Sequence, residues 1–123
     1  MSELHEAAKI GDLVAVVKAL DSGFDLTNKV EGMTALHFAC LYGHIECAKE
    51  LIKRGCDIEQ CDDYGLTAFG VACRGNNVDL ALILIYPYGA NIKTRSKAKR
   101  TAYQDFDKAT IAKFFAQAKL ADY

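Results

Sequence analysis

The sequence lacks the features that mark membrane, secreted and disulfide-bonded proteins. Its longest apolar run covers only residues 80–85, far short of the roughly 20 residues that span a bilayer. No basic segment followed by an apolar one occurs at the start, so we expect no signal or transit peptide. The five cysteines contain no C-x-x-C pair, and their odd number favours reduced thiols. We therefore expect a cytoplasmic protein, with the nucleus as the alternative.

Motifs for catalysis and cofactor binding are also missing. The chain has no phosphate-binding glycine loop, no nucleophile elbow and no evident pair of catalytic carboxylates. Its three histidines and five cysteines follow no metal-ligand spacing. We therefore expect no enzyme activity, no metal and no cofactor.

Charge is distributed unevenly along the chain. Residues 1–92 carry 7 Lys/Arg against 13 Asp/Glu, a net charge of −6, whereas residues 93–123 carry 8 against 3, a net charge of +5. Five of the eight residues from Lys93 to Arg100 are basic. This run is open to three interpretations: a solvated loop, a contact for an acidic protein surface, or a nuclear-import signal. A nucleic-acid interface is not expected, because the rest of the chain is acidic.

Internal repetition dominates what is present in the 123 residues. The segment Thr34-Ala-Leu-His-Phe-Ala-Cys recurs, at a shift of 33, as Thr67-Ala-Phe-Gly-Val-Ala-Cys. It also aligns, at a shift of 32, with the segment that begins at Ser2. A shift of 34 relates Gly89 to Gly55, so one residue has entered nearby, and a weaker copy begins at Thr101.

Each copy predicts two short helices followed by an extended segment. The first helix begins at a hydroxyl N-cap: Ser2, Thr34, Thr67 or Thr101. It ends at a residue that tolerates a left-handed backbone: Gly11, Gly43 or Asn76. The second helix carries apolar residues at helical spacing, in the first copy Val14, Val17 and Leu20. Because no copy can bury its apolar face alone, stacked copies share one core.

These residues resemble the ankyrin repeat, which has a period of about 33 and a Thr-Pro-Leu-His-x-Ala signature. Alanine replaces the usual proline, and Gly70 replaces the histidine found at His5 and His37. The resemblance implies an all-α solenoid of about four stacked helix-turn-helix units with finger turns. We expect one domain, residues 1–123, with units near 2–28, 29–61, 62–95 and 96–123. Degenerate ends are expected too: a shortened first helix at Thr101 and an altered turn where Lys99 replaces glycine.

The resemblance also implies structural roles for the reactive side chains. His5 and His37 are expected to bond to neighbouring backbone, and His44 is expected to be structural as well. Cys40 and Cys73 share one repeat position, where a small buried residue is needed. A redox sensor built from Cys61 and Cys56 stays open as an alternative, although the acidic neighbours disfavour a thiolate.

Proteins of the ankyrin type generally bind other proteins through their finger tips and the concave face of their first helices. The resemblance therefore implies a small monomeric adaptor or regulator that binds a protein and neither nucleic acid nor membrane. Carried over by repeat position, the partner-binding residues are Lys9, Ile10, Glu31, Met33, Leu41, Tyr42, Asp63, Tyr64, Leu66, Arg74, Lys97 and Arg100. We expect Tyr42 and Tyr64 to be the anchors.

A second, narrower resemblance leaves another function open. The small size and the ending from Thr101 through Lys113-Phe-Phe resemble the stand-alone ankyrin proteins of the myotrophin type. Members of that type bind the actin-filament capping protein. Actin capping protein is therefore one candidate partner.

Overall fold

The computed structural model describes residues 2–120, and the regular structure of this part of the chain is helical. The helices are α1 (Glu3–Ile10), α2 (Leu13–Asp21), α3 (Ala35–Tyr42), α4 (Ile45–Lys53), α5 (Ala68–Arg74), α6 (Val78–Ile85) and α7 (Lys108–Leu120). Residues 2–120 form no strand beyond two isolated bridges, Val30 with Met33 and Arg95 with Thr101. None of these helices is long and apolar enough to cross a membrane. The predicted all-α class is confirmed.

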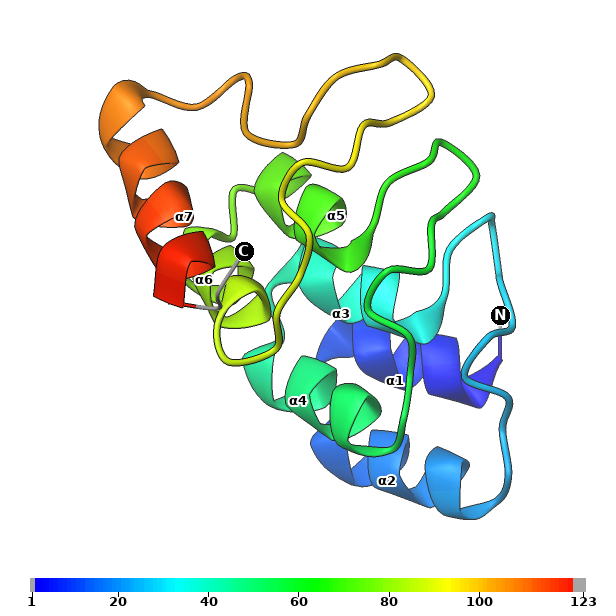
Figure 1. Cartoon of the computed structure of the whole chain (residues 1–123). Helices are drawn as coiled ribbons and strands as arrows, with labels where there is room; N and C mark the ends of the chain where they lie inside the picture. The colour runs from blue at the N-terminus through cyan, green and yellow to red at the C-terminus, as the bar shows by residue number, and fades with distance from the viewer. Residues whose placement is uncertain (1, 121–123) are drawn as a thin grey trace.

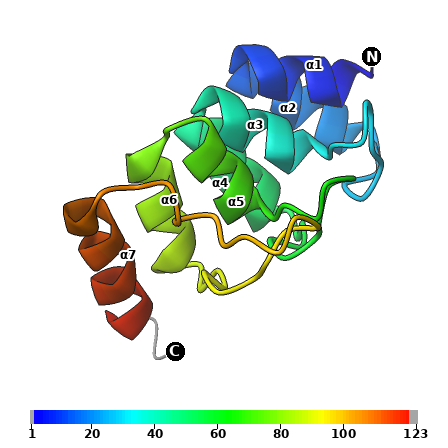
Figure 2. The ribbon, with the colours of Figure 1, turned by 90° about the horizontal axis from the view of Figure 1, so that it is seen from above.

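The helices are stacked in two rows. Helices α1, α3 and α5 pack side by side, and each is also packed against the helix that follows it, α2, α4 or α6. Helix α7 packs against α6 at the far end of the stack (Figure 2). Three extended segments project to the same side of the stack (Figure 1). We call residues 28–34, 61–67 and 94–101 the first, second and third fingers.

The predicted caps begin the first helix of each of the three pairs. The side chains of Ser2, Thr34 and Thr67 each accept the backbone N–H of the residue three positions on. Helix α1 ends at Gly11, whose φ of 81° lies in the left-handed region that costs glycine little. A Cβ at this glycine would lie only 2.5 Å from Nδ1 of His44. The glycine therefore also makes room for the next pair.

The core repeats with the sequence. Three successive pairs contribute one large residue from the same helix position: Leu4, Leu36 and Phe69, all at most 4% exposed. Small residues occupy two further positions, and these are Ala7, Ala39 and Ala72, then Ala8, Cys40 and Cys73. The free thiols thus take the place of a methyl group between closely packed helices. One core cluster runs from Leu4 to Ala118.

The predicted apolar face of α2 is partly wrong. Val14 is 65% exposed, whereas Val16 and Ala19 are the buried residues of this helix. Helix α2 belongs to the first pair, so it is packed against α1 and α4 and no described helix covers its outer side. The contacts with α1 and α4 therefore decide which residues of α2 face the core.

The shortened first helix expected at Thr101 is absent. Residues 101–106 form turns, and the next helix begins only at Lys108. The N–H of Thr101 donates to Oε1 of Gln104 at 2.6 Å, but the Thr101 hydroxyl caps nothing. Asp107 instead accepts the N–H of Thr110 at 2.8 Å, so this carboxylate supplies the cap where α7 starts.

Candidate functional site

Backbone hydrogen bonds join the three fingers into one row. The N–H of Asp63 donates to the carbonyl of Gly32 at 3.1 Å, which ties the second finger to the first. The N–H of Lys97 donates to the carbonyl of Tyr64 at 3.0 Å, which ties the third finger to the second. An ion pair of 3.4 Å between Lys29 and Asp63 adds to the first of these links. The finger tips therefore form a continuous edge along the stack (Figure 1).

The turn at the tip of each finger is fixed by local hydrogen bonds. In the first finger, Val30 and Met33 exchange two bonds of 2.8 and 3.1 Å. In the second finger, the N–H of Asp62 donates to Leu66 O at 2.8 Å. The Asp62 carboxylate then accepts the N–H groups of Tyr64 and Leu66, both at 2.9 Å. This buried carboxylate holds the second turn in shape.

The third finger keeps the turn of the second, although a glycine is missing from it. The N–H of Ser96 donates to Arg100 O at 3.0 Å, and the N–H of Lys99 donates to Ser96 O at 2.8 Å. The same two bonds occur at the matching positions of the second finger, and Lys99 adopts a left-handed φ of 60°. The expectation that Lys99 alters the turn is therefore wrong. The link from Lys97 to the second finger holds the turn in spite of the backbone strain at Lys99.

The histidines join neighbouring units through the backbone, as expected. Nδ1 of His37 accepts the N–H of Thr34 at 3.2 Å, so its other nitrogen, Nε2, donates to Leu66 O at 2.9 Å. Burial of the ring lowers the pKa of His37, which favours this neutral form. Nε2 of His44 lies 2.9 Å from the carbonyl of Lys9 in the unit before it, and Nε2 of His5 lies 2.9 Å from the carbonyl of Asn28, where the first finger begins. Each of these rings is thus held by a structural bond to the backbone.

Asn77 makes an equivalent link that sequence reasoning missed. Its Nδ2 donates to the carbonyls of Cys40 and Leu41 at 2.8 and 2.9 Å. In the third unit the residue occupies the repeat position of His44, which bonds in the same way to Lys9. The repeat alignment was therefore the signal that could have identified Asn77.

Burial keeps the thiols of Cys40, Cys47, Cys56 and Cys73 protonated. Burial raises the pKa of Cys56 and of Cys73 to about 12, and it raises the pKa of Cys40 as well. Cys61, half-buried, places Sγ 3.8 Å from the carbonyl of Glu59. Within residues 2–120 no three His, Cys, Asp or Glu side chains gather as a metal site requires. Cys56 thus lacks the thiolate that redox sensing needs.

The structure divides the twelve predicted binding residues into two groups. The exposed ones are Ile10, Glu31, Tyr42, Asp63, Tyr64, Arg74, Lys97 and Arg100. The half-buried ones are Lys9, Met33, Leu41 and Leu66. Met33 packs against the core cluster, so less of its surface is open to a partner.

The two predicted anchor tyrosines are both open to solvent. Tyr64 is 71% exposed at the tip of the second finger, and Tyr42 is 48% exposed at the end of α3. The ammonium of Lys9 lies 5.7 Å from the centre of the Tyr42 ring, so the two side chains meet across neighbouring helices. Ile10, 61% exposed, follows Lys9 at the end of α1.

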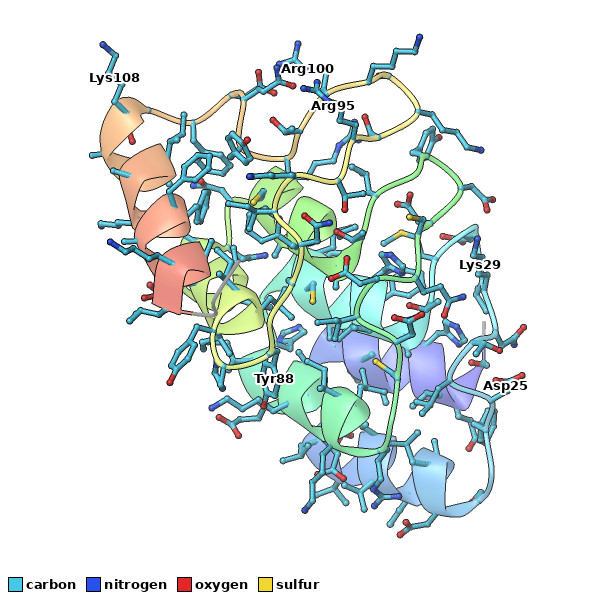
Figure 3. All side chains as sticks on the ribbon, in the orientation of Figure 1. Asp25, Lys29, Tyr88, Arg95, Arg100 and Lys108 are labelled. Carbon is cyan, nitrogen blue, oxygen red and sulfur yellow. The ribbon has the colours of Figure 1, made fainter. Side chains whose placement is uncertain are left out.

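Basic side chains gather on the third finger. Arg95 and Arg100 lie near one another there, while Lys29 lies on the first finger (Figure 3). Nη1 of Arg95 donates to Lys99 O at 3.0 Å, and Arg100 pairs with the carboxylate of Asp105. The basic run identified in the sequence is thus an exposed finger.

A hollow that sequence reasoning did not predict opens between α5 and the third finger. It measures about 540 Å³, and its lining includes Gly70, Arg74, Arg100, Thr101 and Phe106. Its one sequence signal is the missing histidine at Gly70, which alone looks like ordinary degeneration of a repeat. The unused cap at Thr101 becomes visible only in the structure.

Comparison with known proteins agrees with this geometry. A family model described as Ankyrin repeats (3 copies) matches residues 4–96. The matched region covers all three helix pairs and ends in the third finger.

Several curated proteins share part of this sequence. Human protein phosphatase 1 regulatory subunit 27 is 46% identical over 54 residues, which are 44% of this chain and 35% of that protein. Ankyrin repeat and SOCS box protein 11 of Pongo abelii is 33% identical over 105 residues, 82% of this chain and 31% of that protein. Inversin of Gallus gallus is 30% identical over 86 residues, 68% of this chain and 8% of that protein. This chain spans about a third or less of each.

Proposed function

The chain belongs to the ankyrin-repeat family, and on that premise we propose that it is a small adaptor or regulator acting by reversible binding of one protein. The family makes the chain a protein-interaction module. In this proposal residues 1–123 act as one domain of four units, 2–28, 29–61, 62–95 and 96–123. The partner contacts a strip on the finger tips and first helices. The strip comprises Lys9, Ile10, Glu31, Met33, Leu41, Tyr42, Asp63, Tyr64, Leu66, Arg74, Lys97 and Arg100.

The observation that carries the proposal is the exposure of the two tyrosines. Tyr64 is 71% exposed and Tyr42 is 48% exposed, and both lie outside the core cluster. Aromatic side chains that are rigid and exposed beside charged ones are typical of binding hot spots. The fingers that carry them are held in one row by backbone bonds, so little ordering entropy is lost when a partner binds.

An affinity capture from cell lysate tests the proposal. The wild-type chain is compared with Tyr42→Ala/Tyr64→Ala, after circular dichroism has shown that the variant is folded. A matched control, Val14→Ala/Phe24→Ala, removes exposed apolar side chains outside the strip. We expect one protein to be captured by the wild type and by the control and lost by the tyrosine variant. Capture by all three chains would show that the strip is not the contact surface.

Two candidate partners are added to that test in purified form. Relatives of this chain are regulatory subunits of protein phosphatase 1, so purified protein phosphatase 1 is the first. Actin capping protein is the second, on the likeness of the ending Thr101 through Lys113-Phe-Phe to the myotrophin type. Barbed-end actin assembly in the presence of capping protein checks the latter: a capping regulator changes the elongation rate, and an unchanged rate rejects this partner.

The redox alternative has less support than protein binding. Burial raises the pKa of Cys56 to about 12, so this thiol is almost fully protonated at neutral pH. Titration with a thiol reagent under mild oxidant tests the sensor directly. Reaction at Cys61 no faster than that of free cysteine would reject it.

A further inference from the structure

The hollow beside α5 lies where a side chain present in the previous unit is missing. In that unit the ring of His37 reaches from α3 to the carbonyl of Leu66. Gly70 takes the place of His37 in the next unit and has no side chain to reach the matching carbonyl, that of Arg100. The turns at residues 101–106 leave the space unfilled on the other side, since no helix forms there. A hollow of about 540 Å³ results, which is within the size range of pockets that bind ligands.

Thr101 belongs to the wall of this hollow, and its hydroxyl is buried behind that wall without a hydrogen bond. Thr101 is only 9% exposed, and its Oγ1 has no partner within residues 2–120. The matching hydroxyls of Thr34 and Thr67 are both bonded to helix N–H groups. A buried hydroxyl left unpaired is unfavourable. A ligand atom that accepts a hydrogen bond from the Thr101 hydroxyl would therefore form a bond that the free chain lacks.

Two arginines and one aspartate, Asp105, are among the residues that line the hollow. Arg74 and Arg100 both contribute to its wall. In the described part of the chain Arg74 makes no ion pair, whereas Arg100 is paired with Asp105. The side chain of Asp105 is 82% exposed, so this pair is weakly held and open to exchange. The pair with Asp105 thus shows that the guanidinium of Arg100 can bind a carboxylate at this place.

We propose that this hollow receives a carboxylate side chain from an acidic segment of the protein partner. The carboxylate takes the place of Asp105 on Arg100, faces Arg74 and accepts a hydrogen bond from the Thr101 hydroxyl. The net charge of +5 over residues 93–123 favours an acidic segment over a neutral one and speeds its approach. This inference rests on the proposed function, because it names the kind of partner that the strip binds.

A labelled decapeptide of glutamate is the probe, with a glutamine decapeptide as its neutral control. Fluorescence anisotropy at physiological salt measures the affinity of the complete chain. Asp105→Asn frees Arg100, and we expect binding about five-fold tighter, the size of one exposed ion pair. Asp79→Asn makes the same charge change on α6, away from the hollow, and we expect a change of less than about two-fold.

A second variant tests the hydroxyl without the risk of unfolding. Thr101→Val keeps the shape of the side chain and removes an unsatisfied polar atom, so the unfolding free energy should not fall. The affinity for the glutamate peptide should nevertheless fall about five-fold or more, as expected for one lost charge-assisted bond. Amide shifts in a ¹⁵N correlation spectrum should centre on Gly70, Arg74 and Thr101.

Three outcomes would overturn the inference. Asp105→Asn and Asp79→Asn could act alike, Thr101→Val could bind as the wild type does, or free glutamate could bind as tightly as the peptide. In the first two cases attraction to the basic finger explains the binding, and in the third the ligand is a small carboxylate. The proposed function is judged separately, because partner capture that depends on Tyr42 and Tyr64 would stand even if the hollow binds no acidic segment.

Discussion

Replacing His37 with alanine should destabilise the chain more than replacing His44, a less buried histidine that also joins two units. The ring is 1% exposed and bonds through both nitrogens: Nε2 donates to Leu66 O, and the single lone pair of Nδ1 accepts both the N–H and the hydroxyl of Thr34. The bonding at each nitrogen contributes about 1 kcal/mol net. The truncation also leaves a cavity and a buried, unpaired N–H at Thr34, which together cost about 1–2 kcal/mol more. The expected loss is thus about 3–4 kcal/mol of unfolding free energy.

Urea denaturation followed by circular dichroism measures this loss through the midpoint at constant m-value. His44→Ala is the matched control, because that ring is only half-buried and makes one bond, to the carbonyl of Lys9. We expect the control to lose about 1 kcal/mol. Equal losses in the two variants would refute the reasoning, since the buried bonds of His37 would then contribute no more than one half-buried bond.

Three further predictions concern pH, thiols and the third finger. Burial lowers the pKa of His37, so the native state binds fewer protons than the unfolded state and stability should fall as the pH drops below about 6.5; urea midpoints at pH 7.5, 6.5 and 5.5 check this, and His37→Gln should flatten the slope. Cys40 and Cys73 are buried with raised pKa values, so iodoacetamide should modify them only as fast as the chain unfolds, as measured by mass spectrometry at increasing urea. Ser96→Asp places a carboxylate where Asp62 caps two N–H groups in the second finger, and it should slow amide exchange in the third finger and raise stability by about 0.5–1 kcal/mol; unchanged exchange would show that the two turns are not equivalent.

The helix pairs were predictable because each is specified by local signals that occur three times. A hydroxyl cap, two turns of helix and a left-handed terminus are each decided within a few residues. The regular spacing of the copies then gives the stacking, since identical faces pack alike. These local signals do not determine which residues of α2 face the core. Val14 is exposed because α2 is at the end of the stack. The spacing of apolar residues in an end helix does not show which of its sides a neighbouring helix covers.

The third finger shows a local rule overridden by tertiary contacts. A lysine at positive φ is unfavourable by itself, so Lys99 predicted a changed turn. The bond from Lys97 to Tyr64 O and the bonds that close the turn hold the backbone in the earlier conformation. Packing also limits the exposure of the binding strip. Met33 is half-buried because it packs against the core cluster, which repeat position alone could not indicate.

The places where the repeat fails are the places where this chain can differ in function from its relatives. Residues that recur at each position are explained by packing, so they carry no information about a partner. Gly70 breaks the pattern in the sequence and Thr101 breaks it in the structure, where its hydroxyl caps no helix, and the two residues belong to different units. The fold brings them to the same hollow, together with Arg74 and Arg100. The wall of that hollow holds two arginines and a threonine whose hydroxyl has no partner within residues 2–120, and the carboxylate that we propose would contact all three side chains.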